Sequence, residues 1–178
     1  MKKYLTSGFF CVCAIIILGA VARFFTPIPN FTPVAAIALF GGAYLGKKHL
    51  AFVIPIAMLV ITDCFIGVYD SLTMSAVYAS FILTGVIGVV LSKKLTVKNT
   101  VIAAVVSSVL FFVITNFATW ISGFCGYPMT FGGLVLCYEM ALPFFRNEIL
   151  GTLVYSGVFF GAYELLKARY PQLATITR

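Results

Sequence analysis

Charged residues are scarce in this sequence. They make up 10% of its 178 residues, whereas 62% are hydrophobic. A soluble domain carries about 25% charged residues. A chain of this size and composition could not shield its apolar surface from water. We therefore expect an all-α integral membrane protein that forms a single domain over residues 1–178 and is embedded in a lipid bilayer.

Histidine is almost absent, and this limits the chemistry that the chain could perform. The single histidine, His49, lies beside Lys47 and Lys48, and the five cysteines have no metal-ligand spacing. The sequence contains no serine elbow, histidine triad or H-E-x-x-H motif. We therefore expect no catalytic residue, no metal site and no cofactor, and we interpret the chain as a non-enzyme. A disulfide between Cys125 and Cys137 is left open.

A phosphate-binding loop is also not predicted. The stretch Gly41–Lys48 (GGAYLGKK) fits G-x-x-x-x-G-K, but Lys48 stands where such a loop has Ser or Thr. The chain is therefore not expected to carry an ATPase of its own.

The basic residues lie at the ends of apolar segments. The net charge is +7, but this distribution is typical of membrane topology and not of a nucleic-acid groove. We predict six spans, at about residues 8–25, 34–46, 50–69, 74–91, 100–121 and 143–169. The basic residues then place both termini in the cytoplasm of a bacterial inner membrane, with only Arg23 and Arg146 outside. The first span also resembles a secretory signal, which the charges do not exclude.

Glycine and proline are concentrated after the fifth span. Gly123, Gly126, Pro128, Gly132 and Gly133 break the helical pattern. The apolar piece that follows, residues 134–142, is too short to cross a bilayer. We therefore predict an outer loop or re-entrant lid over residues 122–142, with Pro143 opening the last helix.

Small residues four positions apart predict two close helix contacts. Ala38 and Gly42 form one such pair, and Gly157 and Gly161 form the other. The second pair also leaves open a structural or assembly role, in which it is an interaction face.

Polar residues gather near the outer ends of the predicted spans. Thr115, Asn116 and Thr119 lie on one helical face. Together with neighbouring loops and helix ends they suggest a site for a small organic ligand with one or two charged groups. The candidate ligand-binding residues are Asn30, Thr32, Asp63, Asn116, Trp120, Tyr127, Glu139, Arg146, Asn147 and Glu148.

Some of these residues allow other interpretations. Asp63 could be a buried structural acid or the acid of a self-contained proton-coupled carrier, and charges inside a bilayer are expected to pair. Arg146 could pair with Asp63 or with Glu148, or could be a lipid-facing anchor. Trp120 and Tyr127 could belong to an interfacial aromatic belt.

Several local motifs resemble a family of uncharacterised bacterial membrane proteins whose members are described as transport proteins. These motifs are Pro29–Val34, Ala38–Gly42, Thr115–Phe117 with Trp120, Tyr127-Pro128-x-Thr130, and Pro143–Asn147 with Gly151. The family is similar to the substrate-binding S-components of energy-coupling-factor (ECF) vitamin transporters. The resemblance implies six helices and a ligand cavity near the outer face. It also implies a transmembrane coupling subunit and two cytoplasmic ATPases as partners in vitamin uptake.

Overall fold

A computed structural model describes residues 6–45, 49–67 and 70–174, and helices make up all the regular secondary structure in this part of the chain. The predicted all-α class is therefore confirmed, and no strand occurs in these ranges. The α-helices are α1 (Ser7–Ala22), α2 (Val34–Leu45), α3 (Leu50–Ile66), α4 (Ser71–Leu91), α5 (Val97–Ser122) and α6 (Phe131–Arg169), with the 3₁₀ turns η1 (Arg23–Phe25) and η2 (Pro171–Ala174).

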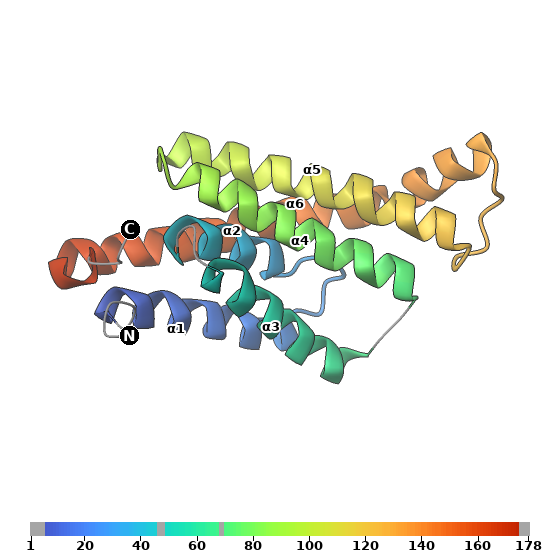
Figure 1. Cartoon of the computed structure of the whole chain (residues 1–178). Helices are drawn as coiled ribbons and strands as arrows, with labels where there is room; N and C mark the ends of the chain where they lie inside the picture. Colours follow the sequence, from blue (N-terminus) through green and yellow to red (C-terminus); the bar gives the residue numbers. More distant parts are fainter. Residues whose placement is uncertain (1–5, 46–48, 68–69, 175–178) are drawn as a thin grey trace.

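Four of these helices are long and apolar enough to cross a bilayer: α1 with η1, α4, α5 and α6. They indicate a multi-pass membrane protein. Helices α2 and α3 are apolar but shorter, with 12 and 17 residues. The start of α1, the α4–α5 turn and the end of α6 lie at one end of the bundle, and the α5–α6 loop lies at the other (Figure 1).

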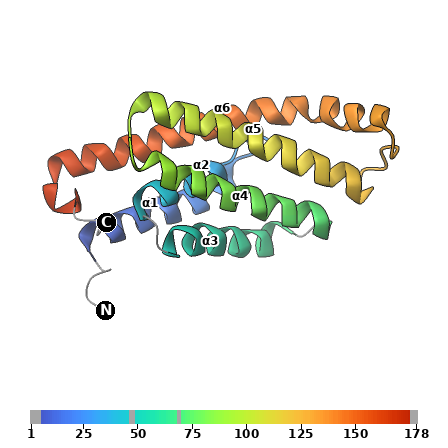
Figure 2. The ribbon, with the colours of Figure 1, turned by 45° about the horizontal axis from the view of Figure 1, so that its top comes forward.

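The short helix α2 lies inside the bundle, among the longer helices (Figure 1, Figure 2). Its residues 34–43 and Leu45 are all buried. Where α2 crosses α4, a Cβ added at Gly42 would lie 2.1 Å from the backbone oxygen of Gly85, and one at Gly88 would lie 2.3 Å from that of Leu39. Ala38, one turn before Gly42, is buried as well. Ala38 and Gly42 therefore lie on the face of α2 that packs against α4.

The second predicted packing pair has no partner within the described chain. Gly157 and Gly161 are exposed, and a Cβ at either position would meet no atom within 4 Å. Their side of α6 faces outward, so the contact predicted from their spacing is not made inside this bundle.

The structure corrects the predicted end of the chain. Helix α6 begins at Phe131, where the side chain of Thr130 accepts a hydrogen bond from the backbone N–H of Gly133. The whole helix has 39 residues, which corresponds to about 58 Å at 1.5 Å per residue, and it continues through Pro143 without a break. The prediction that Pro143 opens a helix is therefore wrong, and the loop shortens from residues 122–142 to 123–130. A proline inside a membrane helix removes only one backbone donor, and packed neighbours can offset that loss.

Candidate functional site

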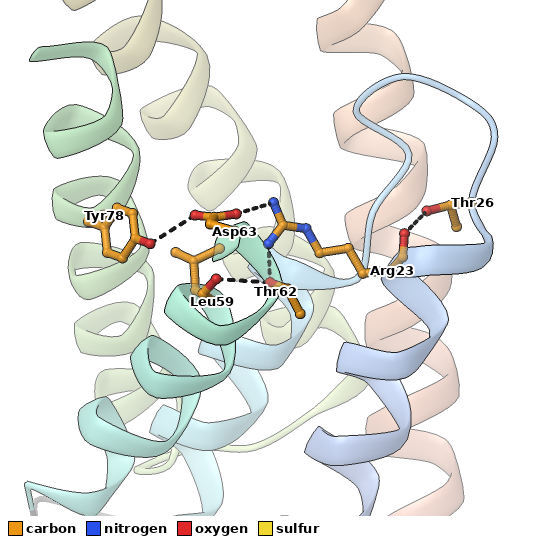
Figure 3. A network of polar contacts seen from close by, with 6 residues as sticks. All are labelled: Arg23, Thr26, Leu59, Thr62, Asp63 and Tyr78. Atoms are coloured by element: carbon orange, nitrogen blue, oxygen red, sulfur yellow. Dashed lines mark hydrogen bonds and ion pairs between the residues drawn. The ribbon is translucent and has the colours of Figure 1, made fainter. Parts of the chain in front are cut away.

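A buried ion pair and the hydrogen bonds around it join η1, α3 and α4 (Figure 3). Nη2 of Arg23 lies 2.8 Å from Oδ1 of Asp63, and their side chains are only 17% and 5% exposed. The hydroxyl of Tyr78 donates to Oδ2 of Asp63 at 2.8 Å. Nη1 of Arg23 donates to the hydroxyl of Thr62, which itself donates to the Leu59 carbonyl at 2.9 Å. Both charges are thus paired, as charges within a bilayer require.

This arrangement decides the partner of Asp63, which the sequence left open. Arg146 is exposed and forms no ion pair with Asp63 or Glu148. Arg23, which the sequence placed only as an outer topological charge, takes that position because it lies where α1 passes into η1, opposite the second half of α3. Asp63 therefore has a structural partner on another helix.

Beside this ion pair lies a cavity of about 440 Å³, a size typical of small-molecule sites. Its walls come from η1, the α1–α2 connector (residues 26–33), the start of α2, α4, α5 and the middle of α6. The lining residues are Arg23, Asn30, Thr32, Val34, Thr73, Val77, Phe81, Phe111, Phe112, Thr115, Asn116, Thr119, Ala141, Phe144, Phe145 and Glu148. Four of the predicted site residues are therefore together: Asn30, Thr32, Asn116 and Glu148.

Aromatic rings form much of the cavity wall. Phe81 of α4 stacks with Phe111 of α5 at a centroid distance of 5.2 Å. Phe112 of α5 stacks with Phe145 of α6 at 4.3 Å. These two pairs give the cavity flat apolar faces and hold its three longest helices together.

The predicted polar stripe of α5 faces this cavity. The hydroxyls of Thr115 and Thr119 donate to backbone carbonyls one turn earlier in α5, and the hydroxyl of Thr73 in α4 lies 3.4 Å from that of Thr119. Nδ2 of Asn116 donates to the Phe112 carbonyl at 2.7 Å. Oδ1 of Asn116 has no hydrogen-bond partner among the described residues, and it can therefore accept a bond from a ligand.

Glu148 is the acid of the cavity wall. It is only 4% exposed, and its Oε1 accepts a hydrogen bond from the Thr152 hydroxyl at 3.1 Å. Neither a hydrogen bond nor an ion pair reaches its Oε2 from any residue that the structure describes. Ala141, Phe144, Phe145 and Glu148 share one face of α6, because their spacing follows the helical repeat.

The α1–α2 connector is held against α6. Nδ2 of Asn147 donates to the Pro29 carbonyl at 3.0 Å. A Cβ at Gly151 would lie 3.1 Å from Cα of Phe31 and from the backbone nitrogen of Thr32. Asn30 has a positive φ of 59°, which asparagine tolerates better than most residues. Asn147 thus supports the connector and does not line the cavity itself.

The other predicted site residues lie elsewhere. Nε1 of Trp120 donates to the Pro128 carbonyl at 3.0 Å, so the indole holds the α5–α6 loop. Tyr127 is half-buried in that loop, and Glu139 is exposed on α6 outside the cavity. Cys125 and Cys137 are both free, and the thiol of Cys137 donates to the Asn116 carbonyl at 3.5 Å. The described ranges contain no group of three His, Cys, Asp or Glu residues that could hold a metal ion.

The lining residues that sequence reasoning missed include Arg23, Thr73 and the phenylalanines. The phenylalanines carried a usable signal, because Phe111 and Phe112 precede Thr115 and Asn116 by one helical turn and share their face. Arg23 and Thr73 carried none, because only the packing of α1, α3 and α4 brings them to the cavity.

Comparison with known proteins finds one family. No curated protein and no solved structure matches the chain. Residues 3–173 match a family that is described as a family of unknown function, DUF6580. Because this match covers nearly the whole sequence, the chain belongs to the DUF6580 family.

Proposed function

We propose that this protein is the substrate-binding membrane subunit of a micronutrient uptake transporter of the ECF type. The observation that carries the proposal is the cavity of about 440 Å³, which combines phenylalanine faces with a few polar groups. Small-molecule sites have this composition, because apolar walls supply affinity and a few polar groups fix orientation.

The position of the cavity agrees with capture from outside the cell. Thr73 lies in the first turn of α4 and Thr119 in the last turn of α5, whereas Lys93, Lys94 and Lys98 lie near the α4–α5 turn at the other end. If the lysine-rich end is cytoplasmic, as the positive-inside rule predicts, the cavity lies toward the extracytoplasmic face.

A six-span topology with both termini in the cytoplasm is part of the proposal. Helix α2 is about 18 Å long and the hydrocarbon core is about 30 Å thick, so α2 needs the connector to complete its crossing. Irregular backbone is tolerated at membrane depth where protein covers it or where it lines a cavity. The connector meets both conditions, because it packs on α6 and lines the cavity.

The topology can be tested by labelling single cysteines in intact cells. In a background without the other four cysteines, a membrane-impermeant maleimide is expected to label Cys125 in the α5–α6 loop. In a cysteine-free background, Lys93→Cys is expected to react only after the membrane is opened. The reverse pattern would overturn the orientation.

Ligand binding can be tested by native mass spectrometry of the full chain purified in a mild detergent. We expect a retained small metabolite. Ala141→Phe should abolish this retention because the new ring fills the cavity, whereas the control Ala168→Phe, on an exposed position of α6, should not. Equal retention by both variants would exclude this cavity, and a chain that retains no metabolite would contradict the binding function.

Energy coupling needs a separate experiment. The tagged chain is expected to copurify with a transmembrane subunit and cytoplasmic ATPases, and uptake should require ATP. Uptake that continues without ATP and stops when the proton gradient is collapsed would instead support a self-contained carrier.

A further inference from the structure

The two acids near the cavity differ in their partners. The charge of Asp63 is balanced by Arg23 at 2.8 Å, and its second oxygen accepts a hydrogen bond from Tyr78. The guanidinium of Arg23, which reaches the cavity wall, is in turn held by Asp63 and Thr62. This pair is neutral as a unit, so it contributes no net charge to the cavity.

Glu148 has no such balance. Within the described chain its only side-chain partner is the Thr152 hydroxyl, which donates to Oε1. No basic side chain of that part of the chain lies within ion-pair distance of it. Arg146, two residues earlier on α6, is exposed. An ionised Glu148 therefore gives the cavity a net negative charge.

An unpaired carboxylate in a buried position is unfavourable, because the low dielectric of the protein interior replaces the water that would solvate it. A ligand that brings a positive group removes this cost. The surrounding rings favour the same kind of ligand, because the face of a phenylalanine attracts a cation within about 6 Å of its centroid.

We propose that the cavity selects a small aromatic cation, such as a protonated aryl amine or a heteroaromatic cation. Its positive group lies against Oε2 of Glu148, and its ring lies along the phenylalanine walls. Oδ1 of Asn116 is free to accept a second hydrogen bond from the same ligand. This inference rests on the proposed function and specifies the class of substrate.

Three indole probes of similar size test the charge preference: tryptamine, which carries an ammonium group, tryptophol, which carries a hydroxyl, and indole-3-acetate, which carries a carboxylate. Their affinities are measured by calorimetry on the full chain in detergent. We expect tryptamine to bind more tightly than tryptophol by roughly tenfold to a hundredfold, the range expected for one hydrogen bond between charged groups. Indole-3-acetate should bind most weakly.

Substitutions show whether Glu148 causes this preference. Glu148→Gln keeps the shape of the side chain but removes its charge, so tryptamine and tryptophol should bind equally. Glu148→Asp keeps the charge and should still prefer tryptamine to tryptophol. Comparison of the two variants therefore separates loss of the charge from loss of folding. The control Glu139→Gln removes an exposed acid of the same helix, outside the cavity, and should bind like the unaltered protein.

The outcomes separate this inference from the proposed function. Equal binding of tryptamine and tryptophol, or a preference that survives Glu148→Gln, would overturn the cation preference. If none of the three probes binds, the cation preference is also overturned. If Ala141→Phe still abolishes retention of the copurified metabolite in that case, the proposed binding function remains in place. Absence of both probe binding and a retained metabolite would overturn the two together.

Discussion

Oδ1 of Asp63 lies 2.8 Å from Nη2 of Arg23, and this contact joins the end of α1 to the second half of α3. The pair is almost fully enclosed, and Tyr78 extends it to α4. Two charged residues that would each be costly alone in a bilayer therefore compensate each other where three helices meet.

Removing one member of this pair should be far more destabilising than removing both. Arg23→Met leaves a buried carboxylate without its cation, and we expect the free energy of unfolding to fall by about 3–5 kcal/mol. The double substitution Arg23→Met with Asp63→Leu should cost much less. Both can be measured by SDS titration of the folded protein in mixed micelles.

The exposed ion pair of α6 supplies the control. The Lys167–Glu164 pair lies at 2.6 Å, but its side chains are 33% and 41% exposed. Lys167→Met should therefore change the free energy of unfolding by no more than about 1 kcal/mol. Equal losses for Arg23→Met and for the double substitution would contradict the buried-pair argument.

The crossing of α2 and α4 should not accept a methyl group. A Cβ at Gly42 would lie 2.1 Å from the Gly85 oxygen, so Gly42→Ala must push the two helices apart. We expect a loss of about 1–3 kcal/mol in stability, the usual cost of overpacking. Thermal denaturation in detergent would measure it.

Gly161→Ala is the matched control, because nothing lies within 4 Å of its added Cβ. In water alanine favours a helix over glycine by about 1 kcal/mol, so this variant should melt at the same temperature or slightly higher. Similar destabilisation by both substitutions would show that the α2–α4 contact is not the cause.

Gly151→Val should disturb the cavity although Gly151 is not one of its lining residues. The valine would press on the backbone of Phe31 and Thr32, which lies 3.1 Å from the position of its Cβ. Displacement of the connector moves Asn30 and Thr32, so we expect weaker ligand retention and faster hydrogen exchange over residues 28–32. The same substitution at Gly157, where the space is open, should change neither; an unmoved connector in Gly151→Val would refute the proposed support.

The stability of the first turn of α4 should depend on pH, because Asp70 caps this turn. The backbone N–H of Thr73 donates to Oδ2 of Asp70 at 2.8 Å, and this bond lowers the pKa of the carboxyl below its usual value of 3.8. A lowered pKa in the folded state means that the cap stabilises the helix above about pH 3.8 and is lost as the pH falls below that value.

Hydrogen exchange over residues 71–75 can follow this loss. We expect protection in the unaltered protein to decline relative to its value at pH 6 once the pH falls through the lowered pKa. Asp70→Asn retains a capping oxygen but does not titrate, so its protection should not change over the same range. Identical pH profiles would contradict the role of Asp70.

The sequence by itself determined the class of the protein and most of its helices. Scarce charge and long apolar segments require a membrane environment, and the ends predicted for the first four helices lie within three residues of those observed. The face of α5 that carries Thr115, Asn116 and Thr119 was also predictable, because helical periodicity alone places these residues together.

Only the tertiary structure decided which residues of different helices meet. The choice of Arg23 over Arg146 as the partner of Asp63 depends on how α1 packs against α3, and no local pattern encodes that contact. Only the structure shows that α6 continues through Pro143, because intrinsic propensity predicts a break there. Tertiary packing also encloses Glu148 beside the phenylalanine walls and leaves its Oε2 without a partner among the described residues.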